Sequence, residues 1–168
     1  LYEQYVTGEY FERYDLPKRR IPERLRPRVL QLKAGSRPGL KPCLTVRDAL
    51  LDLPEPKMGC ECKGFHNHVG IPGARLYKGH TGSYLDAPAK TIKAGVNGCP
   101  GGENIVVKDN GSFRYFTVRE AARLQTFPDT YRFHGSRSEC MRQIGNAVPV
   151  SMAKLLLSSL RPLMSKRA

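Results

Sequence analysis

The sequence predicts an α/β fold, in which a small, irregular, β-rich region is followed by helices. Three observations predict it. Glycine and proline recur through residues 55–116 among short β-type runs. Capping signals precede apolar segments near residues 45 and 117, and apolar residues recur at helical spacing beyond Pro149. We therefore divide the chain into residues 1–44, 45–116 and 117–168.

Residues 1–44 are predicted to be a basic, proline-rich arm or connector. The first 16 residues hold five tyrosines and phenylalanines among acids, which favours a short helix or an extended arm. Residues 17–42 are rich in Pro, Arg and Lys, and prolines at this density break regular structure into short pieces. We expect an extended connector with one or two helical turns.

Two helices are predicted from their first turns. Thr45 precedes Asp48 by three residues, and Thr117 precedes Glu120 by the same spacing. In this capping box, the threonine oxygen and the carboxylate each accept a hydrogen bond from a backbone amide of the first turn. We expect helices to begin directly after both threonines.

The region between these helices is predicted to hold short strands and long loops. Residues 90–94 and 104–108 are β-type runs. The turn signal at 109–112 precedes 113–116, which we expect to form the answering strand of a hairpin. Such loops carry recognition more often than packing.

The last helix is predicted to begin near Pro149, since proline is tolerated in the first turn. Its apolar residues fall close to i, i+3, i+4, i+7 spacing, and Pro162 is expected to end it. The stripe serves as core or as an interface with a partner chain. It consists of Ala153, Leu156, Leu157, Leu160 and either Leu163 or Met164.

The formal net charge of +13, from 28 basic against 15 acidic residues, points to a polyanionic partner. The basic residues extend from Lys18 to Arg167, which favours a broad basic face. Neutralising several phosphates would make binding strongly dependent on salt. The alternative is a soluble basic protein with no nucleic-acid partner, because charge indicates partners and not fold.

Five cysteines, an odd number, without a signal peptide or a long apolar run favour a reduced, cytosolic setting. Residue 1 is Leu, so we expect either that the start of the gene product is missing or that this piece comes from a longer chain. Cys60, Cys62, His66 and His68 are zinc-like residues, but their spacing is tighter than that of structural zinc pairs. We predict no metal and keep zinc as an alternative.

Residues 117–129 and 143–149 resemble the ninth and tenth conserved blocks of the DNA (cytosine-5) methyltransferases. The ninth block is a helix that anchors the target-recognition domain to the catalytic domain. Its matching positions imply structural roles here. Glu120 closes the cap, Leu124 and Phe127 are buried, and Arg119 and Arg123 tie loops through bidentate hydrogen bonds.

The tenth block, Gln143-Ile144-Gly145-Asn146-Ala147-Val148-Pro149, closes one wall of the S-adenosyl-L-methionine pocket in that family. The resemblance implies that Asn146, Ala147 and Val148 line the cofactor. We read Gly145-Asn146 as a turn that opens the last helix, with Gly145 allowing a tight backbone. The alternative is that Asn146 only caps this helix.

Residues 85–94 resemble a recognition-domain segment in which a threonine touches the DNA backbone near the extruded base. The resemblance places Thr91 in that role, and the loop at 78–83 is a second candidate for reading bases. Asn67-His68 also fits the family's spacing. The DNA-binding candidates are Thr91, Lys90, His80, Gly101 and Gly102.

The catalytic motifs of the family do not occur in these residues. The sequence holds no Phe-x-Gly-x-Gly cofactor loop, no Pro-Cys-Gln nucleophile loop, no Glu-Asn-Val strand and no Gln-x-Arg-x-Arg strand. Pro42-Cys43 is followed by Leu44 where the family has Gln, and it leads directly into a helix cap. We therefore predict no catalytic residue in this chain.

The resemblance implies the DNA-recognition subunit of a two-chain methyltransferase that transfers a methyl group from S-adenosyl-L-methionine to C5 of a flipped cytosine. A partner would supply the catalytic cysteine, the helices here would complete its Rossmann-like domain, and this chain alone would be inactive. We expect double-stranded DNA as substrate and a bacterial, cytoplasmic, nucleoid-associated restriction-modification setting. The alternatives are a non-enzymatic DNA-binding or regulatory module, a C-terminal fragment of a single-chain enzyme, and a zinc-containing interaction domain.

Overall fold

A computed structural model describes residues 1–35, 39, 43–79, 81–94 and 104–164, with side chains described as far as residue 160. The chain forms two compact units, Leu1–Cys43 and Leu44–Ala168. We describe each unit by itself. His80, Gly101 and Gly102, three of the predicted DNA-binding residues, lie outside the described residues.

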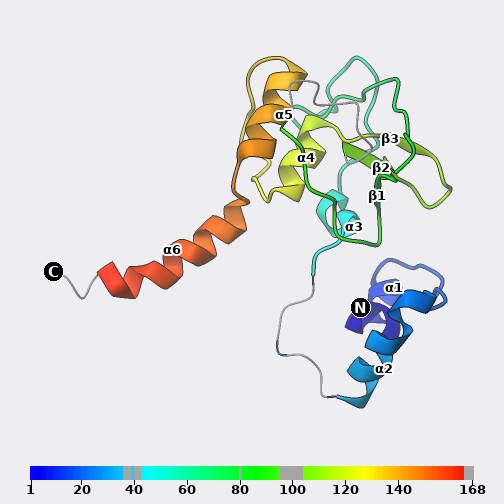
Figure 1. Cartoon of the computed structure of the whole chain (residues 1–168). Coiled ribbons are helices and arrows are strands. Elements are labelled where there is room, and N and C mark those ends of the chain that lie inside the picture. Colours follow the sequence, from blue (N-terminus) through cyan, green and yellow to red (C-terminus); the bar gives the residue numbers. More distant parts are fainter. Residues whose placement is uncertain (36–38, 40–42, 80, 95–103, 165–168) are drawn as a thin grey trace. The chain divides into compact units, whose positions relative to one another are not determined.

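Unit 1 is built from short helices (Figure 1). They are the π-helix η1 (Glu3–Thr7), α1 (Glu9–Arg13), the 3₁₀ turn η2 (Glu23–Leu25) and α2 (Arg26–Ala34). Tyr10, Phe11 and Val29 are buried at the centre. The rings of Tyr10 and Phe11 meet edge to face, with centroids 5.6 Å apart. The prediction of an extended connector is therefore wrong for α2, because Pro27 lies in the first turn, where proline is tolerated.

Unit 2 contains a three-stranded sheet in the order β1-β2-β3. Strand β1 (Ser83–Tyr84) pairs in parallel with β2 (Ile105–Val107), and β2 pairs antiparallel with β3 (Phe113–Tyr115). Ile105 lies opposite Tyr115, and Val107 lies opposite Phe113. The predicted hairpin is confirmed, with the turn closed by a hydrogen bond from the amide of Lys108 to the carbonyl of Ser112.

Four helices complete unit 2: α3 (Val46–Leu50), α4 (Val118–Leu124), α5 (Arg137–Asn146) and α6 (Val150–Met164). Both predicted capping boxes are present, at Thr45 with Asp48 and at Thr117 with Glu120. A third box, which the sequence reasoning did not identify, joins Ser136 to Glu139 at the start of α5. Each box satisfies amides that the first turn would otherwise leave unpaired.

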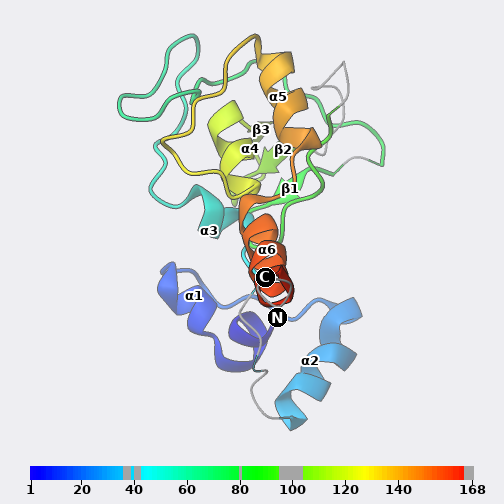
Figure 2. The ribbon, with the colours of Figure 1, turned by 90° about the vertical axis from the view of Figure 1, so that its left-hand side faces the viewer.

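Two apolar cores hold unit 2 together, and α4 contributes to both. The larger core lies between α4 and α5, which lie side by side in two views (Figures 1 and 2). The smaller core joins Val46, Val106 and Phe116, with Leu124 of α4 packed against it. The larger core is formed by Ile92, Val118, Ala121, Ala122, Phe133, Cys140, Met141 and Ile144.

Three local predictions are wrong. Residues 90–94 form no strand, since Ile92 enters the core between α4 and α5 and the sheet pairs β1 with β2 instead. Gly145 and Asn146 end α5 and do not form a turn before the last helix. Helix α6 begins at Val150, as expected, but it continues two residues past Pro162. Proline removes one amide donor, and this loss does not stop the last turn here.

Among the described helices, none has both the length and the apolar character needed to cross a membrane.

Candidate DNA-contacting and cofactor-lining site

Hydrogen bonds from two directions hold the start of α4. The Glu120 carboxylate accepts from the backbone amide of Thr117 at 2.8 Å and receives both Nη atoms of Arg114 at 2.7 Å. Desolvation by burial acts to lower the pKa of Arg114, but hydrogen bonds and charge from Glu120 and Glu55 raise it overall. The predicted cap therefore also anchors strand β3 to α4.

Two arginines of α4 tie loops to the helix, as predicted. Arg119 is completely buried and donates to the backbone carbonyls of His66, Pro128 and Tyr131, at 2.9, 3.2 and 2.6 Å. Arg123 donates to both carboxylate oxygens of Asp129. Its hydrogen bonds hold the pKa of Asp129 below its usual value. Their role is structural, because each nitrogen of the buried Arg119 donates to a backbone carbonyl and Arg123 is held by Asp129.

The Asn67-His68 pair is part of the same framework. His68 is fully buried, its Nδ1 lies 2.9 Å from the Thr117 hydroxyl, and its Nε2 lies 2.8 Å from the Pro54 carbonyl oxygen. The Asn67 side chain exchanges two hydrogen bonds with the backbone of Phe133. Both ring nitrogens of His68 are thus occupied, which disfavours the zinc alternative. In the described part of the chain, no three His, Cys, Asp or Glu side chains gather as metal ligands.

Gly145 is the point at which α5 meets the segment that carries Thr91. A Cβ atom at Gly145 would lie 2.6 Å from the Ala94 amide nitrogen and 2.8 Å from its Cα, closer than real contacts allow. Ile92, 4% exposed, packs in the same core as Met141 and Ile144 of α5. Glycine is therefore needed here for close packing, and the segment with the DNA candidate lies directly against the helix that ends in the cofactor candidate.

Of the two described DNA candidates, Thr91 lies on the outside of this segment and Lys90 is half-buried. Thr91 is exposed, whereas its neighbour Ile92 points into the core. Lys90 donates from its backbone amide to the Ser83 hydroxyl and from its ammonium group to the Thr81 hydroxyl, at 3.1 and 2.8 Å. These bonds connect Lys90 to the loop before β1, the second predicted base-reading element.

The cofactor candidates lie where α5 ends. Asn146 is exposed, Ala147 is half-buried and Val148 is 58% exposed. The amide group of Asn146 has no hydrogen-bond partner within the described part of the chain, so the alternative role as a helix cap is wrong.

The chain is pinned to α4 immediately after these residues. The amide of Val150 donates to the Gln125 carbonyl at 3.1 Å, and the amide of Ser151 donates to the Thr126 hydroxyl at 2.8 Å. Two donors in the first turn of α6 are thereby satisfied by the end of α4. The start of α6 is fixed by the framework, although its apolar side chains remain exposed.

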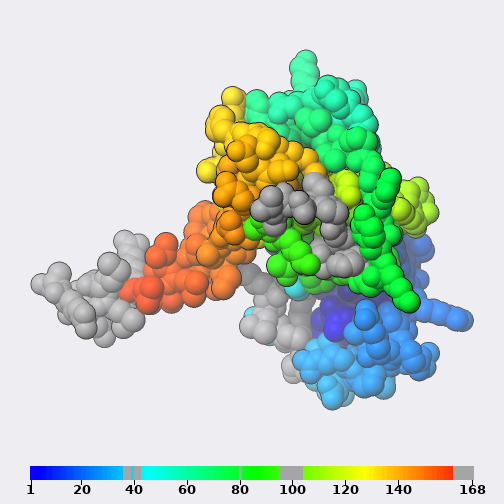
Figure 3. Space-filling model, turned by 45° about the horizontal axis from the view of Figure 1, so that its top comes forward, coloured from blue at the N-terminus to red at the C-terminus, as the bar shows by residue number. Residues whose placement is uncertain are grey.

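A cavity of about 210 Å³ lies between α5 and the loop at 61–71. These two parts of the chain adjoin in the space-filling view (Figure 3). Val69, Val118, Arg137 and Cys140 are among its lining residues, and none of the predicted site residues lines it. Burial lowers the pKa of Arg137 and raises that of the Cys140 thiol. The Arg137 guanidinium lies over the Tyr115 ring, 5.3 Å from its centroid.

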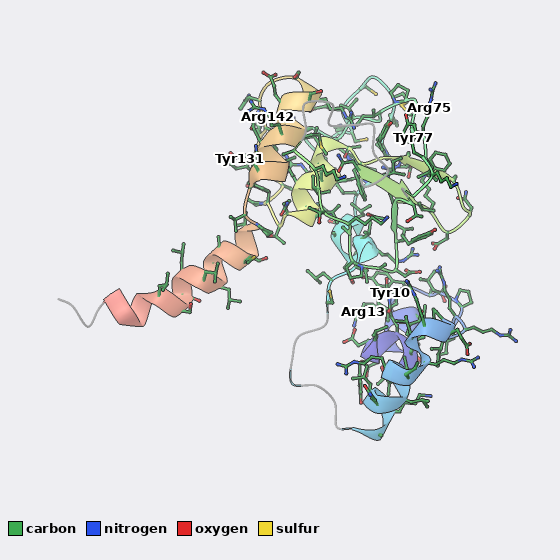
Figure 4. The ribbon with its side chains drawn as sticks, in the orientation of Figure 1. Tyr10, Arg13, Arg75, Tyr77, Tyr131 and Arg142 are labelled. Carbon is green, nitrogen blue, oxygen red and sulfur yellow. The ribbon has the colours of Figure 1, made fainter. Side chains whose placement is uncertain are left out.

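The sequence reasoning also missed two exposed side chains in the loop before β1. Arg75 and Tyr77 stand on the outside of unit 2 (Figure 4), and Tyr77 is 47% exposed. An exposed basic residue close to an exposed aromatic residue is a common combination in surfaces that bind nucleic acid. The sequence signal for such a surface was the tyrosine between two basic residues, in Arg75-Leu76-Tyr77-Lys78.

A model of the family of C-5 cytosine-specific DNA methylases matches residues 62–161, which is more than half of the chain. The chain belongs to this family, whose members are transferases that use S-adenosylmethionine. The predicted resemblance is thus confirmed for the methyltransferase region.

The chain is similar to type II methyltransferases of bacteria. It is 40% identical over 79 residues to M.AplI of Arthrospira platensis, covering 46% of this chain and 23% of that protein. It is 45% identical over 82 residues to M.NgoFVII of Neisseria gonorrhoeae, covering 49% and 21%. An alignment with M.SacI of Streptomyces achromogenes has 147 positions, 31% identity, and coverage of 71% and 37%. The chain therefore spans well under half the length of these relatives.

Proposed function

We propose that this chain is the DNA-recognition subunit of a two-chain DNA cytosine-5 methyltransferase, in which a partner subunit holds the catalytic cysteine. The complex would transfer the methyl group of S-adenosyl-L-methionine to C5 of a flipped cytosine in double-stranded DNA. A base must leave the duplex stack before an enzyme can modify it. The chain alone would be inactive. The naming of the relatives as type II methyltransferases supports a restriction-modification setting.

The exposed apolar stripe of α6 carries this proposal. Leu156, Leu157 and Leu160 are 50%, 67% and 49% exposed, although the start of the helix is pinned to α4. Covering the exposed parts of these three leucines would contribute on the order of 2–5 kcal/mol. A stripe of this kind is typical of an interaction surface. The proposed occupant is the catalytic half of the methyltransferase domain, whose motifs this sequence lacks.

The arrangement around Gly145 supports a joint role in DNA and cofactor binding. The segment with Thr91 lies against α5, and Asn146 ends the same helix. A substrate base held near Thr91 and a methyl donor held near Asn146 would thus be positioned by one rigid element. Asn146, Ala147 and Val148 would form one wall of the cofactor pocket, and S-adenosyl-L-methionine would supply the methyl group.

The decisive experiment mixes this chain with the polypeptide that carries the Pro-Cys-Gln and Phe-x-Gly-x-Gly motifs. We expect methyl transfer to DNA that depends on the cofactor and on both chains. Activity of this chain alone would contradict the proposal. DNA binding without any partner that restores activity would favour a non-enzymatic DNA-binding module, and activity only after covalent fusion to the catalytic half would favour a fragment of a single-chain enzyme.

Two substitutions separate the DNA contact from the cofactor contact. Asn146→Ala should raise the KM for S-adenosyl-L-methionine in the complex and leave its affinity for DNA unchanged. Thr91→Ala should weaken DNA binding and leave cofactor binding unchanged. Ser138→Ala serves as a matched control, because Ser138 is an exposed residue of α5. The opposite pattern would mean that the two roles are exchanged.

A further inference from the structure

Unit 1 carries a dense group of exposed cations. Residues 18–33 contain seven basic side chains and one acidic side chain, Glu23, and all eight are exposed. We call these seven residues the basic face of unit 1. They precede residues 62–161, the part of the chain that the family model matches. The basic face consists of Lys18, Arg19, Arg20, Arg24, Arg26, Arg28 and Lys33.

The basic face belongs to a folded unit and not to a loose arm. On α2 and the turn before it, Leu25 and Leu32 are half-buried and Val29 is 1% exposed. Their spacing of four and three residues directs one face of the helix inward. Helix α1 also has a buried and an exposed side (Figure 4), because Tyr10 is 3% exposed whereas Arg13 is exposed. The backbone positions of Arg24, Arg26, Arg28 and Lys33 are therefore set by η2 and α2 before any partner binds, which reduces the entropy cost of binding.

Four cations of the basic face have no acidic partner in the described part of the chain, although Arg28 donates to the neutral side chain of Gln31. They are Arg20, Arg24, Arg28 and Lys33. Two others are paired, because Lys18 lies 3.3 Å from Glu12 and Arg26 lies 3.1 Å from Glu23. Arg24 of η2 and Arg28 of α2 are four residues apart, on the order of 6 Å along a helix axis, which is comparable with the distance between neighbouring phosphates of one DNA strand. Their charges are thus available at a spacing that suits a phosphate backbone.

We propose that unit 1 is a second DNA-binding element that grips the phosphate backbone without regard to sequence. The choice of DNA as the polyanion rests on the proposed function. A membrane surface fits less well, because an interfacial helix needs a continuous apolar face. The exposed large hydrophobic side chains in the described part of unit 1 are limited to Leu1 and Leu30. Guanidinium groups without exposed apolar neighbours match phosphate oxygens, which accept from them bidentately.

The test compares the full chain with the triple variant Arg20→Gln/Arg24→Gln/Lys33→Gln on a DNA duplex of arbitrary sequence. Affinity is measured over a range of salt concentrations. Removing one cation that neutralises a phosphate should make the slope of log K against log salt shallower by about 0.9. At 0.1 M salt, the affinity should fall by about 8-fold if one such cation is removed and by about 500-fold if three are removed.

The charge-preserving variant Arg20→Lys/Arg24→Lys/Lys33→Arg is the matched control, and it should keep the slope of the wild type. Circular dichroism checks that each variant is folded. An unchanged slope in the glutamine variant, with DNA binding intact, would overturn the inference and leave the proposed function standing. Affinity is also measured for mixed vesicles of phosphatidylcholine and phosphatidylserine. If the wild type binds these vesicles as tightly as it binds DNA, and the glutamine variant loses both affinities to the same extent, the assignment to DNA is overturned.

The proposed function fails separately. If the glutamine variant shows the reduced slope but Thr91→Ala has no effect on DNA binding by the complex, unit 1 binds DNA and the assignment of the recognition segment is wrong. If the wild-type chain does not bind DNA at low salt, both proposals are overturned.

Discussion

Replacing Gly145 by alanine should destabilise unit 2 by forcing α5 away from residues 92–94. The added Cβ would lie 2.6 Å from the Ala94 nitrogen, 2.8 Å from its Cα and 2.9 Å from its Cβ. Two of these three atoms belong to the backbone and cannot rotate away. The segment must therefore move by nearly 1 Å, or the last turn of α5 must unwind, to restore an ordinary contact.

The size of the effect follows from two opposing contributions. Inserting a methyl group into a packed contact costs about 1–3 kcal/mol. Alanine in a helix gains about 0.5–1 kcal/mol over glycine, and Gly145 has an ordinary helical backbone that alanine can adopt. We expect a net loss of about 1–2 kcal/mol, which corresponds to a fall in Tm of about 2–8 °C for a protein of this size.

Thermal unfolding followed by circular dichroism measures this change. Gly39→Ala is the matched control, since a Cβ at Gly39 meets no atom within 4 Å. DNA affinity provides a second measurement, because displacement of residues 92–94 also displaces Thr91. A Gly145→Ala variant that is as stable as the wild type, or more stable, would refute the close packing and with it the link between Thr91 and α5.

Three further predictions concern buried and paired groups. Arg119→Leu removes three hydrogen bonds to carbonyls and should lower the free energy of unfolding by about 3–5 kcal/mol in urea denaturation; a decrease below about 1 kcal/mol would argue against the buried framework. Asp129→Asn should remove part of the acid sensitivity of the fold. Arg123 lowers the pKa of the Asp129 carboxyl in the folded state. The pair therefore stabilises the fold above the unfolded pKa of about 3.9, and this contribution is lost as the pH falls through the folded pKa. Stability curves of both proteins from neutral to acid pH would reveal it, and identical acid limbs would contradict it. The Cys140 thiol, which is 2% exposed and has a raised pKa, should react with a maleimide far more slowly than the exposed Cys60; mass spectrometry of the labelled sites decides, and equal rates would show that α5 opens readily.

The sequence predicted the helix starts and the hairpin because the residues that form each of them are close together along the chain. The capping boxes at Thr45 and Thr117 are recognisable because both partners belong to the same turn of the helix. The β2–β3 hairpin was predicted for the same reason, since its turn joins neighbouring strands. The box at Ser136 has the same pattern, with Glu139 three residues after the serine, so the sequence held the same signal for the start of α5.

Contacts between distant segments decided what the sequence could not. Residues 90–94 have β-type composition, yet burial of Ile92 between two helices leaves the place beside β2 to Ser83 and Tyr84. Gly145 was expected to allow a tight turn. The structure instead requires glycine there because the backbone of Ala94 leaves no room for a Cβ atom. Likewise, proline density predicted an extended connector with one or two helical turns for residues 17–42, but burial of Val29 accompanies a nine-residue helix, α2.

The sequence by itself determined the methyltransferase family, the positive charge that favours DNA, and the starts of α3, α4 and α6, because motifs, charge and caps are properties of neighbouring residues. Only the tertiary structure decided that the Asn146 amide has no partner among the described residues, that Arg119 is a fully buried link between loops, and that Thr91 lies on a segment packed against α5. The physical reason is that burial and close packing depend on which distant atoms come to share one volume.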